Sequence, residues 1–374
     1  MRPYSRVYAT VNLDAVASNM KSMRKNLPAS TLIMGSVKAD GYGHGSVPIA
    51  KTIEPYVFGY AVATIDEGII LRRHGINKTI LILGVTHESQ YEELLRYDIR
   101  TAMFQYEKAK KLSDLAVKQG KKAVVHLALD TGMSRIGMKA DREHAKEAAA
   151  IAALEGIEVE GLFTHFARAD ETDKSAYEEQ YRRYKEFLGY LEKLGVQIPI
   201  RHCSNSAGIV ESLESNHMDM VRAGIAIYGM YPSDEVDHNS VKLTPAMEIK
   251  SCITYIKEIG AGTAVSYGGT FVADHTMKVA TIPVGYGDGY VRSLSGKGDV
   301  LIRGKRAAIL GRICMDQFMV AVPDTITVKP GDKVVLLGSQ GHESISALEI
   351  AALASTIPYE IFCGFSERVP RQYI

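Results

Sequence analysis

Over the first two-thirds of the chain, short apolar runs alternate with longer amphipathic stretches. The amphipathic stretches predict helices, the clearest of which cover 64–74, 105–119, 142–153 and 175–194. The apolar runs predict eight strands, over 31–38, 57–62, 79–83, 99–103, 123–129, 157–163, 200–203 and 218–222. Strands that alternate with helices pair in parallel, and eight such units in about 200 residues match the lower size limit of a (β/α)8 barrel.

The alternative architecture is an open, doubly wound α/β sheet. Its nucleotide-binding form carries a GxGxxG motif where the first strand turns into the first helix. No such motif opens the first βα unit of this chain. The sequence therefore favours the TIM-like barrel.

After about residue 235 the pattern changes. Short β-rich runs separated by turn signals replace the helical periods, and only 347–356 keeps a helical period. We therefore predict an α/β protein with an N-terminal barrel over 1–235 and a C-terminal, mostly β domain over 236–374. In one variant of this prediction, the N-terminal strand joins the C-terminal domain.

Composition and charge narrow the class of protein. The chain is 46% hydrophobic and 23% charged, which is ordinary globular composition. Its formal net charge of +1 gives no electrostatic reason to expect nucleic acid or an anionic membrane as a partner. The longest apolar run, 148–154, is too short to span a bilayer, and the opening residues lack the apolar core of a signal peptide. We expect a cytoplasmic protein that binds neither nucleic acid nor a membrane.

The four cysteines are Cys203, Cys252, Cys314 and Cys363, and no two of them have CxxC spacing. This pattern counts against a disulfide framework and against a structural zinc site, and it fits a reducing compartment. We expect no metal site.

The most informative stretch is SVKADGYGHG, residues 36–45. Lys38 ends a buried strand and enters a loop with three glycines, which in a parallel barrel is the catalytic rim. One interpretation is a lysine that forms a Schiff base, with the glycines letting the backbone approach a cofactor. The other is a lysine in a solvated turn. The GxGxG pattern alone is a weak signal, and it recurs as GYGDG at 285–289.

Three more residues lie at the same predicted rim. Arg135 follows the fifth strand, where an arginine either pairs with a carboxylate or phenolate oxygen or is an ordinary surface residue. His165 ends the sixth strand, either as a base or as a satisfied core residue. Arg222 ends the eighth strand, a position from which it could face a cofactor ring.

The loops after the seventh and eighth strands read RHCSNSAG and VRAGIAIYG. Barrels often bind phosphate in these two loops. Ser206, Gly224 and Ile225 could supply hydroxyl and backbone donors to such a phosphate. Alternatively, Ser206 only caps a helix.

Taken together, these motifs resemble the alanine racemase family over nearly the whole chain. The motifs that carry the resemblance are, in order, VKADGYGHG, DTGMSRIG, THFA, CSNSA, VRAGIAIYG, VSYGGTF, VGYGDGY, GRICMDQ and IPYE. The resemblance implies a barrel that carries pyridoxal 5'-phosphate, a following β domain, and a homodimer whose active sites are shared between subunits. It implies a racemase for a small amino acid, interconverting L- and D-alanine to supply the bacterial cell wall.

The resemblance also implies which residues hold the cofactor. Lys38 would form the Schiff base, Arg222 would donate to the pyridine nitrogen, and His202 would support that arginine. The phosphate would be held by Tyr42, Ser206, Gly224, Ile225 and Tyr359.

On the substrate side, the resemblance implies two bases. Lys38 would serve the D-face and Tyr267 of the partner subunit the L-face, with His165 in contact with that tyrosine. Arg135 and the backbone of Met315 would bind the substrate carboxylate. The entrance would be lined by Asp170, Tyr286, Arg292, Arg312 and Ile357.

One position departs from the family pattern. Many members carry a lysine before the DTGM motif, read as modified to a carbamate that positions the arginine, whereas this chain has Ala128. The pose of Arg135 and the substrate range are therefore open. The alternatives are a racemase for serine, lysine or several amino acids, a decarboxylase of basic amino acids, and a pyridoxal-phosphate carrier without turnover.

Overall fold

The computed structural model describes residues 5–374, which form two compact units. The barrel unit comprises residues 15–41 and 46–245. The β unit comprises the residues up to 14, the short segment 42–45 and residues 246–374. The glycine-rich motif after the first predicted strand is thus divided between the two units.

The barrel unit contains eight parallel strands whose ends pair to close a barrel, which confirms the predicted fold class. The closing pair is β10 on β2, in register from Met220 opposite Leu32 to Ala223 opposite Gly35. In pairing order the strands are β2 (Leu32–Ser36), β3 (Gly59–Val62), β4 (Thr79–Ile82), β5 (Arg100–Met103), β6 (Ala123–Asp130), β8 (Ile157–Phe163), β9 (Ile200–His202) and β10 (Met220–Ala223), with the short β7 (Met138–Lys139) paired to β6.

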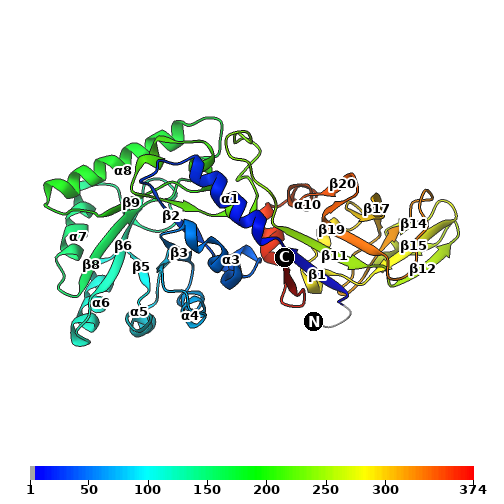
Figure 1. Ribbon diagram of the computed structural model, residues 1–374, viewed down its shortest axis with the longest axis horizontal. Helices are drawn as coiled ribbons and strands as arrows, with labels where there is room; N and C mark the ends of the chain where they lie inside the picture. The colour runs from blue at the N-terminus through cyan, green and yellow to red at the C-terminus, as the bar shows by residue number, and fades with distance from the viewer. Residues whose placement is uncertain (1–4) are drawn as a thin grey trace. The chain divides into compact units, whose positions relative to one another are not determined.

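Helices lie outside the ring of strands (Figure 1). The four that the sequence predicts are α4 (Ile65–Arg73), α6 (Tyr106–Lys118), α7 (Arg142–Ala152) and α8 (Ser175–Lys193). The other helices were not predicted from the sequence, namely α1 (Leu13–Lys25), α3 (Ser46–Ile53), α5 (Tyr91–Tyr97) and α9 (Ser206–Val210). Thr64 and Glu67 form a capping box at the start of α4, which satisfies two backbone N–H groups that the helix leaves unpaired.

The barrel interior is apolar on one side and polar on the other. Met34, Ala61, Leu81 and Met220 form a fully buried cluster on β2, β3, β4 and β10. The buried His126, His202 and Arg222 come instead from β6, β9 and β10. Because buried polar side chains are costly unless they are hydrogen-bonded, the polar side is where a functional site is to be sought.

The β unit is built on one long, mainly antiparallel sheet. Its strand order is β12-β15-β18-β17-β16-β19-β11-β1-β21, with β20 paired to β19. The N-terminal strand β1 lies in this sheet, antiparallel to β11 and parallel to β21. The strands are β1 (Val7–Val11), β11 (Met247–Cys252), β12 (Tyr255–Ile259), β15 (Met277–Ile282), β16 (Asp299–Ile302), β17 (Lys305–Leu310), β18 (Phe318–Ala321), β19 (Lys333–Gln340), β20 (Glu343–Ile345) and β21 (Arg371–Tyr373).

Two short helices complete the β unit, α10 (Ala347–Ala354) and α11 (Pro358–Gly364), together with the small hairpin of β13 (Ala264–Val265) and β14 (Phe271–Val272). Within residues 5–374, no single helix has both the length and the apolar character to cross a bilayer. The pair α10 and α11, bent by 98° at its break, passes that test only when the two are taken together.

Candidate active site

Lys38 lies two residues after the end of β2, at the start of a tight turn labelled α2 (Lys38–Tyr42). The next three residues are left-handed, with φ of 51° at Ala39, 49° at Asp40 and 63° at Gly41. Left-handed backbone costs an L-residue roughly 1–2 kcal/mol. Such strain persists only where the surroundings enforce it, and it concentrates at functional sites.

Side chains of the barrel unit hold this turn in place. Glu67, the residue that caps α4, accepts a hydrogen bond from the Ala39 N–H at 2.7 Å. Asp40 accepts one from the Ser46 N–H, also at 2.7 Å. The turn after Lys38 is therefore pinned at both ends, which fixes where the lysine leaves the backbone.

His165 follows β8 at the same carboxyl end of the barrel. Burial, together with the nearby positive charges of Arg222, Arg135 and Lys38, lowers the pKa of His165 to about 3. The imidazole is therefore neutral at physiological pH. The structure thus brings the four rim residues that the sequence singles out into electrostatic range of one another.

Arg222 is almost fully buried at the end of β10 and is bound by neutral acceptors. One terminal nitrogen donates to His202 Nδ1 at 2.9 Å and to the His202 carbonyl at 3.1 Å. The other donates to the carbonyls of Thr164 and Cys203, at 2.7 and 3.0 Å, and to His165 Nδ1 at 3.2 Å. Burial lowers the pKa of Arg222 to about 10, which leaves the guanidinium charged at neutral pH.

The Nε–H of Arg222 has no acceptor among residues 5–374, and no carboxylate pairs with the guanidinium in this part of the chain. An arginine donates hydrogen bonds but does not give up its proton near neutral pH. The barrel therefore presents a donor, and not an acid, to any ring nitrogen bound beside Arg222.

Sequence reasoning missed two residues that lie behind His202. His202 Nε2 is 2.8 Å from His126 Nδ1, and His126 Nε2 is 2.9 Å from Glu160. A signal was present: a histidine and a glutamate interrupt two predicted strands, AVVHLAL and IEVEGLF, that lie next to each other in the barrel. Polar residues inside buried strands indicate a hydrogen-bonded network.

The two loops after β9 and β10 meet through Ser206. Its hydroxyl accepts hydrogen bonds from the Gly224 N–H at 2.9 Å and, more weakly, from the Ala226 N–H at 3.4 Å. Ile225 begins the short helix η4 (Ile225–Tyr228), which directly follows Gly224. The helix cap in the first of these loops is Asn205, which accepts from the Gly208 N–H at 3.1 Å, so capping does not occupy the Ser206 hydroxyl.

This donor set fits pyridoxal phosphate. The barrel unit offers an amine for the aldehyde, an uncommitted N–H of Arg222 for the ring nitrogen, and hydroxyl and backbone donors at 206 and 224–225 for the phosphate. Among residues 5–374, no group of three or more His, Cys, Asp or Glu side chains is arranged to hold a metal ion.

The candidate residues of the β unit are mostly exposed. Solvent reaches 70% of Tyr267, 53% of Met315, 57% of Ile357 and 43% of Tyr286, although all four are large and apolar or aromatic. Arg312 contacts the turn that carries Tyr267, because its carbonyl accepts a hydrogen bond from Ser266 at 2.6 Å.

The remaining candidates occupy different places. Tyr42 is buried, and its ring lies 5.9 Å from that of Tyr359, both in the β unit. Arg292 begins the short helix η7 (Arg292–Leu294) of that unit, whereas Asp170 lies in the loop before α8 of the barrel unit. The roles of these residues are addressed below as proposals.

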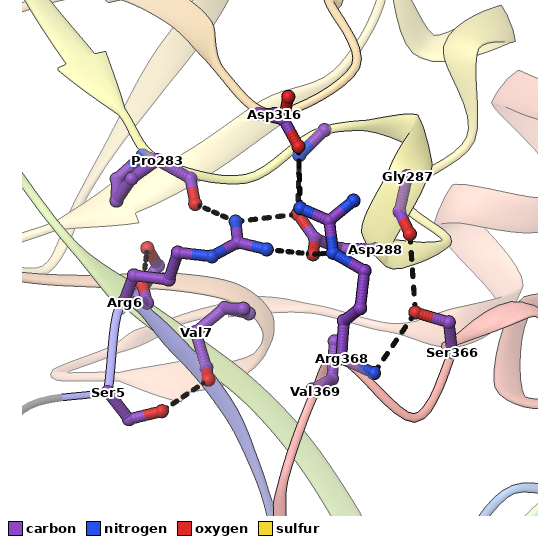
Figure 2. Close-up of polar contacts among 12 residues, drawn as sticks. Ser5, Arg6, Val7, Pro283, Gly287, Asp288, Asp316, Ser366, Arg368 and Val369 are labelled. Carbon is purple, nitrogen blue, oxygen red and sulfur yellow. Dashed lines mark hydrogen bonds and ion pairs between the residues drawn. The ribbon is translucent and has the colours of Figure 1, made fainter.

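A buried carboxylate organises the loops that carry Tyr286 and Met315. Asp288 is fully buried and receives hydrogen bonds from Arg6 and from the Gly285 N–H, and Arg368 lies 3.3 Å from it (Figure 2). The loop that Asp288 closes is joined to the next one by hydrogen bonds from the Tyr286 and Gly287 N–H groups to the carbonyls of Cys314 and Met315, at 3.1 and 2.9 Å. Asp288 therefore ties two candidate loops to the N-terminal strand and to the C-terminal segment.

Comparison with known proteins places the chain in a family. Its sequence matches the alanine racemase N-terminal domain over residues 11–232 and the alanine racemase C-terminal domain over 246–373. The chain belongs to the alanine racemase family. This confirms the resemblance that the motifs predict, and members of the family depend on pyridoxal phosphate.

Similar relatives span nearly the full length of the chain. An alanine racemase of Desulforamulus reducens is 44% identical over 98% of this chain and 99% of its own, and one of Clostridium perfringens is 45% identical over 98% and 95%. Among solved structures, alanine racemase from Clostridium difficile 630 is 40% identical, with a TM-score of 0.96 over 100% of this chain and 97% of that one. Alanine racemase from Bacillus anthracis with bound L-Ala-P is 36% identical, with a TM-score of 0.94 over 100% and 96%.

Position 128, where the sequence departs from the family pattern, lies in the apolar interior of the structure. Ala128 is buried and packs with Ala102 and Phe163, with Leu83 and Phe104 at the edge of the cluster. An apolar cluster therefore surrounds the position at which the resemblance led us to expect a modified lysine. Arg135 itself is exposed.

Proposed function

We propose that this protein is a pyridoxal-phosphate-dependent alanine racemase that uses Lys38 and the Tyr267 of a second subunit as its two bases. The observation that carries the proposal is the convergence of Lys38, Arg135 and Arg222 on a neutral His165 at the carboxyl end of a closed barrel. Three cationic side chains around one neutral imidazole suit an anionic cofactor and a substrate carboxylate.

When bound, pyridoxal phosphate supplies an electron sink for the pair left at Cα after its proton departs. Lys38 Nζ takes or returns that proton on one face of the substrate, and Tyr267 Oη does so on the other. One base on each face lets the proton leave from one side and return from the opposite side without rotation of the substrate. Arg135 and the Met315 backbone hold the substrate carboxylate.

Arg222 holds the cofactor ring without protonating it. Its Nε–H donates to the ring nitrogen, while its two terminal nitrogens stay bound to His202, Thr164, Cys203 and His165. Tyr42, Ser206, Gly224, Ile225 and Tyr359 hold the phosphate. By donating to the ring nitrogen without protonating it, Arg222 would limit the electron withdrawal that the cofactor supplies, and would so favour racemisation over transamination and decarboxylation.

The proposal includes a homodimer with shared sites. The exposure of Tyr267, Met315 and Ile357 supports it, because exposed large apolar and aromatic side chains are candidates for burial in a protein contact. The entrance residues Asp170, Tyr286, Arg292, Arg312 and Ile357 would then be supplied by both subunits. None of the four cysteines forms a disulfide in the structure, which fits the reducing cytoplasm, where D-alanine for the cell wall would be made.

Chiral chromatography tests the proposal directly. Purified protein with added pyridoxal phosphate is incubated separately with L-alanine, L-serine and L-lysine, and the enantiomers of each are quantified. We expect D-alanine to form fastest, because relatives that are 44–45% identical over 98% of this chain are alanine racemases.

Other outcomes identify the rival functions. Faster production of D-serine or D-lysine would make the protein a racemase of different specificity. Release of carbon dioxide with a matching amine would identify a decarboxylase. Turnover of none of the three, with cofactor bound, would identify a carrier.

A further inference from the structure

A continuous row of polar side chains crosses the barrel interior behind Arg222. Arg222 bonds to His202, His202 to His126, and His126 to Glu160, at 2.9, 2.8 and 2.9 Å between the nitrogen and oxygen atoms concerned. Both histidines are completely buried. We name these four residues the relay.

All three hydrogen bonds of the relay run from Arg222 toward Glu160, because an arginine side chain can only donate hydrogen bonds. His202 must accept from Arg222 at Nδ1, so its proton is on Nε2 and is donated to His126 Nδ1. His126 then carries its own proton on Nε2 and donates it to Glu160. A second proton on either ring would place two N–H groups face to face, and burial correspondingly lowers the pKa of both histidines.

Two backbone features exist to accommodate the relay. A Cβ on Gly161 would lie 2.4 Å from His126 Nδ1, so only glycine at this position of β8 lets the imidazole reach across to β9. In the same place the pairing of β6 with β8 shifts register: Val125 lies opposite Val159 but His126 lies opposite Gly161. Glu160 is the extra residue, and a bulge of this kind re-aims a side chain.

The relay ends at Glu160, a carboxylate, whereas no carboxylate pairs with Arg222 at the other end of the row within residues 5–374. Burial opposes ionisation of Glu160, but the hydrogen bond from His126 and the charge of Arg100, 3.4 Å away, outweigh it and lower the pKa of that carboxyl. Arg100 opens β5, whereas Arg222 lies near the end of β10, so the row runs from the amino end of the barrel to its carboxyl end.

We propose that His126 and Glu160 are positioning residues for the racemase reaction. They lock His202 as a neutral Nε2–H tautomer, and so hold Arg222 as a hydrogen-bond donor to the cofactor ring. Glu160 ends the row as the acceptor for His126, at a place from which it cannot act as an acid toward the ring nitrogen. This inference rests on the proposed function for its kinetic consequence, but not for its tautomers.

Two variants of β8 separate the charge of Glu160 from a general effect on the strand. Glu160→Gln keeps an oxygen acceptor for His126 and removes the charge. Glu158→Gln makes the same chemical change two residues earlier, at an exposed side chain, and is the matched control. We expect Glu160→Gln to lower kcat for alanine about tenfold with KM unchanged, which is the lower end of what an outer-layer hydrogen-bond partner contributes, and the control to change neither.

The second readout is nitrogen-15 NMR of histidine in the full-length wild-type holoenzyme, with signals assigned by His126→Gln. We expect His126 and His202 to show the Nε2–H tautomer and to remain neutral from about pH 6 to pH 9, across the range where a free imidazole titrates. An Nδ1–H tautomer or an imidazolium at either position would overturn the proposal, as would equal kinetics in the two glutamate variants. If the wild type turned over no amino acid, the proposed function would fail, and the NMR result alone would decide the relay.

Discussion

The two units of this protein differ in how far their candidate residues are buried. In the barrel unit, Arg222 and His202 are buried and are bound by acceptors of the same chain. In the β unit, Tyr267, Met315 and Ile357 are exposed, and the fully buried carboxylate of Asp288 holds loops in place. The difference shows that Arg222 and His202 are held by their own chain, whereas the β unit leaves large side chains exposed, which in the proposed homodimer a second copy would cover.

We expect the largest loss of activity from a substitution in the barrel unit. Lys38→Ala removes both the amine that binds the aldehyde and one proton acceptor, so we expect racemisation to fall by at least ~10⁴-fold. The visible absorbance of the Schiff base should disappear as well. Lys51→Ala, on an exposed position of α3, is the control and should leave both unchanged. Absorbance that survives Lys38→Ala would assign the aldehyde to another lysine.

The next largest loss of activity should come from Tyr267, an exposed residue of the β unit. Tyr267→Phe should lower racemisation by about 10²–10⁴-fold, which is the usual contribution of a single acid–base group, while cofactor stays bound. Tyr255→Phe alters another exposed tyrosine of the β unit and should be silent.

Mixing the two inactive variants shows whether sites are shared. If each site takes Lys38 from one subunit and Tyr267 from the other, re-equilibrated Lys38→Ala and Tyr267→Phe chains form mixed dimers with one intact site. Statistical exchange in a two-fold dimer then restores about a quarter of wild-type activity. No recovery after verified exchange would mean that each chain completes its own site.

A smaller effect distinguishes buried from exposed carboxylates within the cluster of Figure 2. Asp288→Asn removes the charge that Arg6 and Arg368 share, and should lower the free energy of unfolding by about 2–3 kcal/mol in urea titrations. Asp316→Asn removes an exposed carboxylate that contacts the same Arg368 at 2.5 Å, and should cost less than about 1 kcal/mol. Equal losses would mean that burial of Asp288 adds nothing.

The last effect is a slope of stability with pH. His165 titrates near 3 in the folded barrel, because of burial and the charges of Arg222, Arg135 and Lys38, but near 6.5 when unfolded. Between these values the unfolded chain binds one more proton, so stability falls as pH is lowered from about 6.5, by up to about 1.4 kcal/mol per pH unit. His165→Asn should remove that part of the slope, and His275→Asn, at an exposed histidine, should not. Unchanged slopes in both variants would place the titrating group elsewhere.

Much of the fold was predictable because its signals are local. Eight apolar runs and four long amphipathic stretches define the barrel, and the predicted strands lie within about two residues of those observed. The sequence did not predict helix α5, because seven residues give little periodicity. It also did not predict that the segment 42–45 belongs to the β unit, because no local pattern shows this. The site was predictable where a motif marks a strand end, as at Lys38, His165 and Arg222.

The sequence by itself determined the family, the barrel and the residues at its carboxyl rim, because strand periodicity and ordered motifs are properties of the chain alone. Tertiary structure decided which polar groups meet. His126 and Glu160 are 34 residues apart in sequence, and they touch because a register shift and a glycine on β8 bring them together. It likewise decided that His165 is neutral, since the pKa of a histidine depends on burial and on charges that come from other strands.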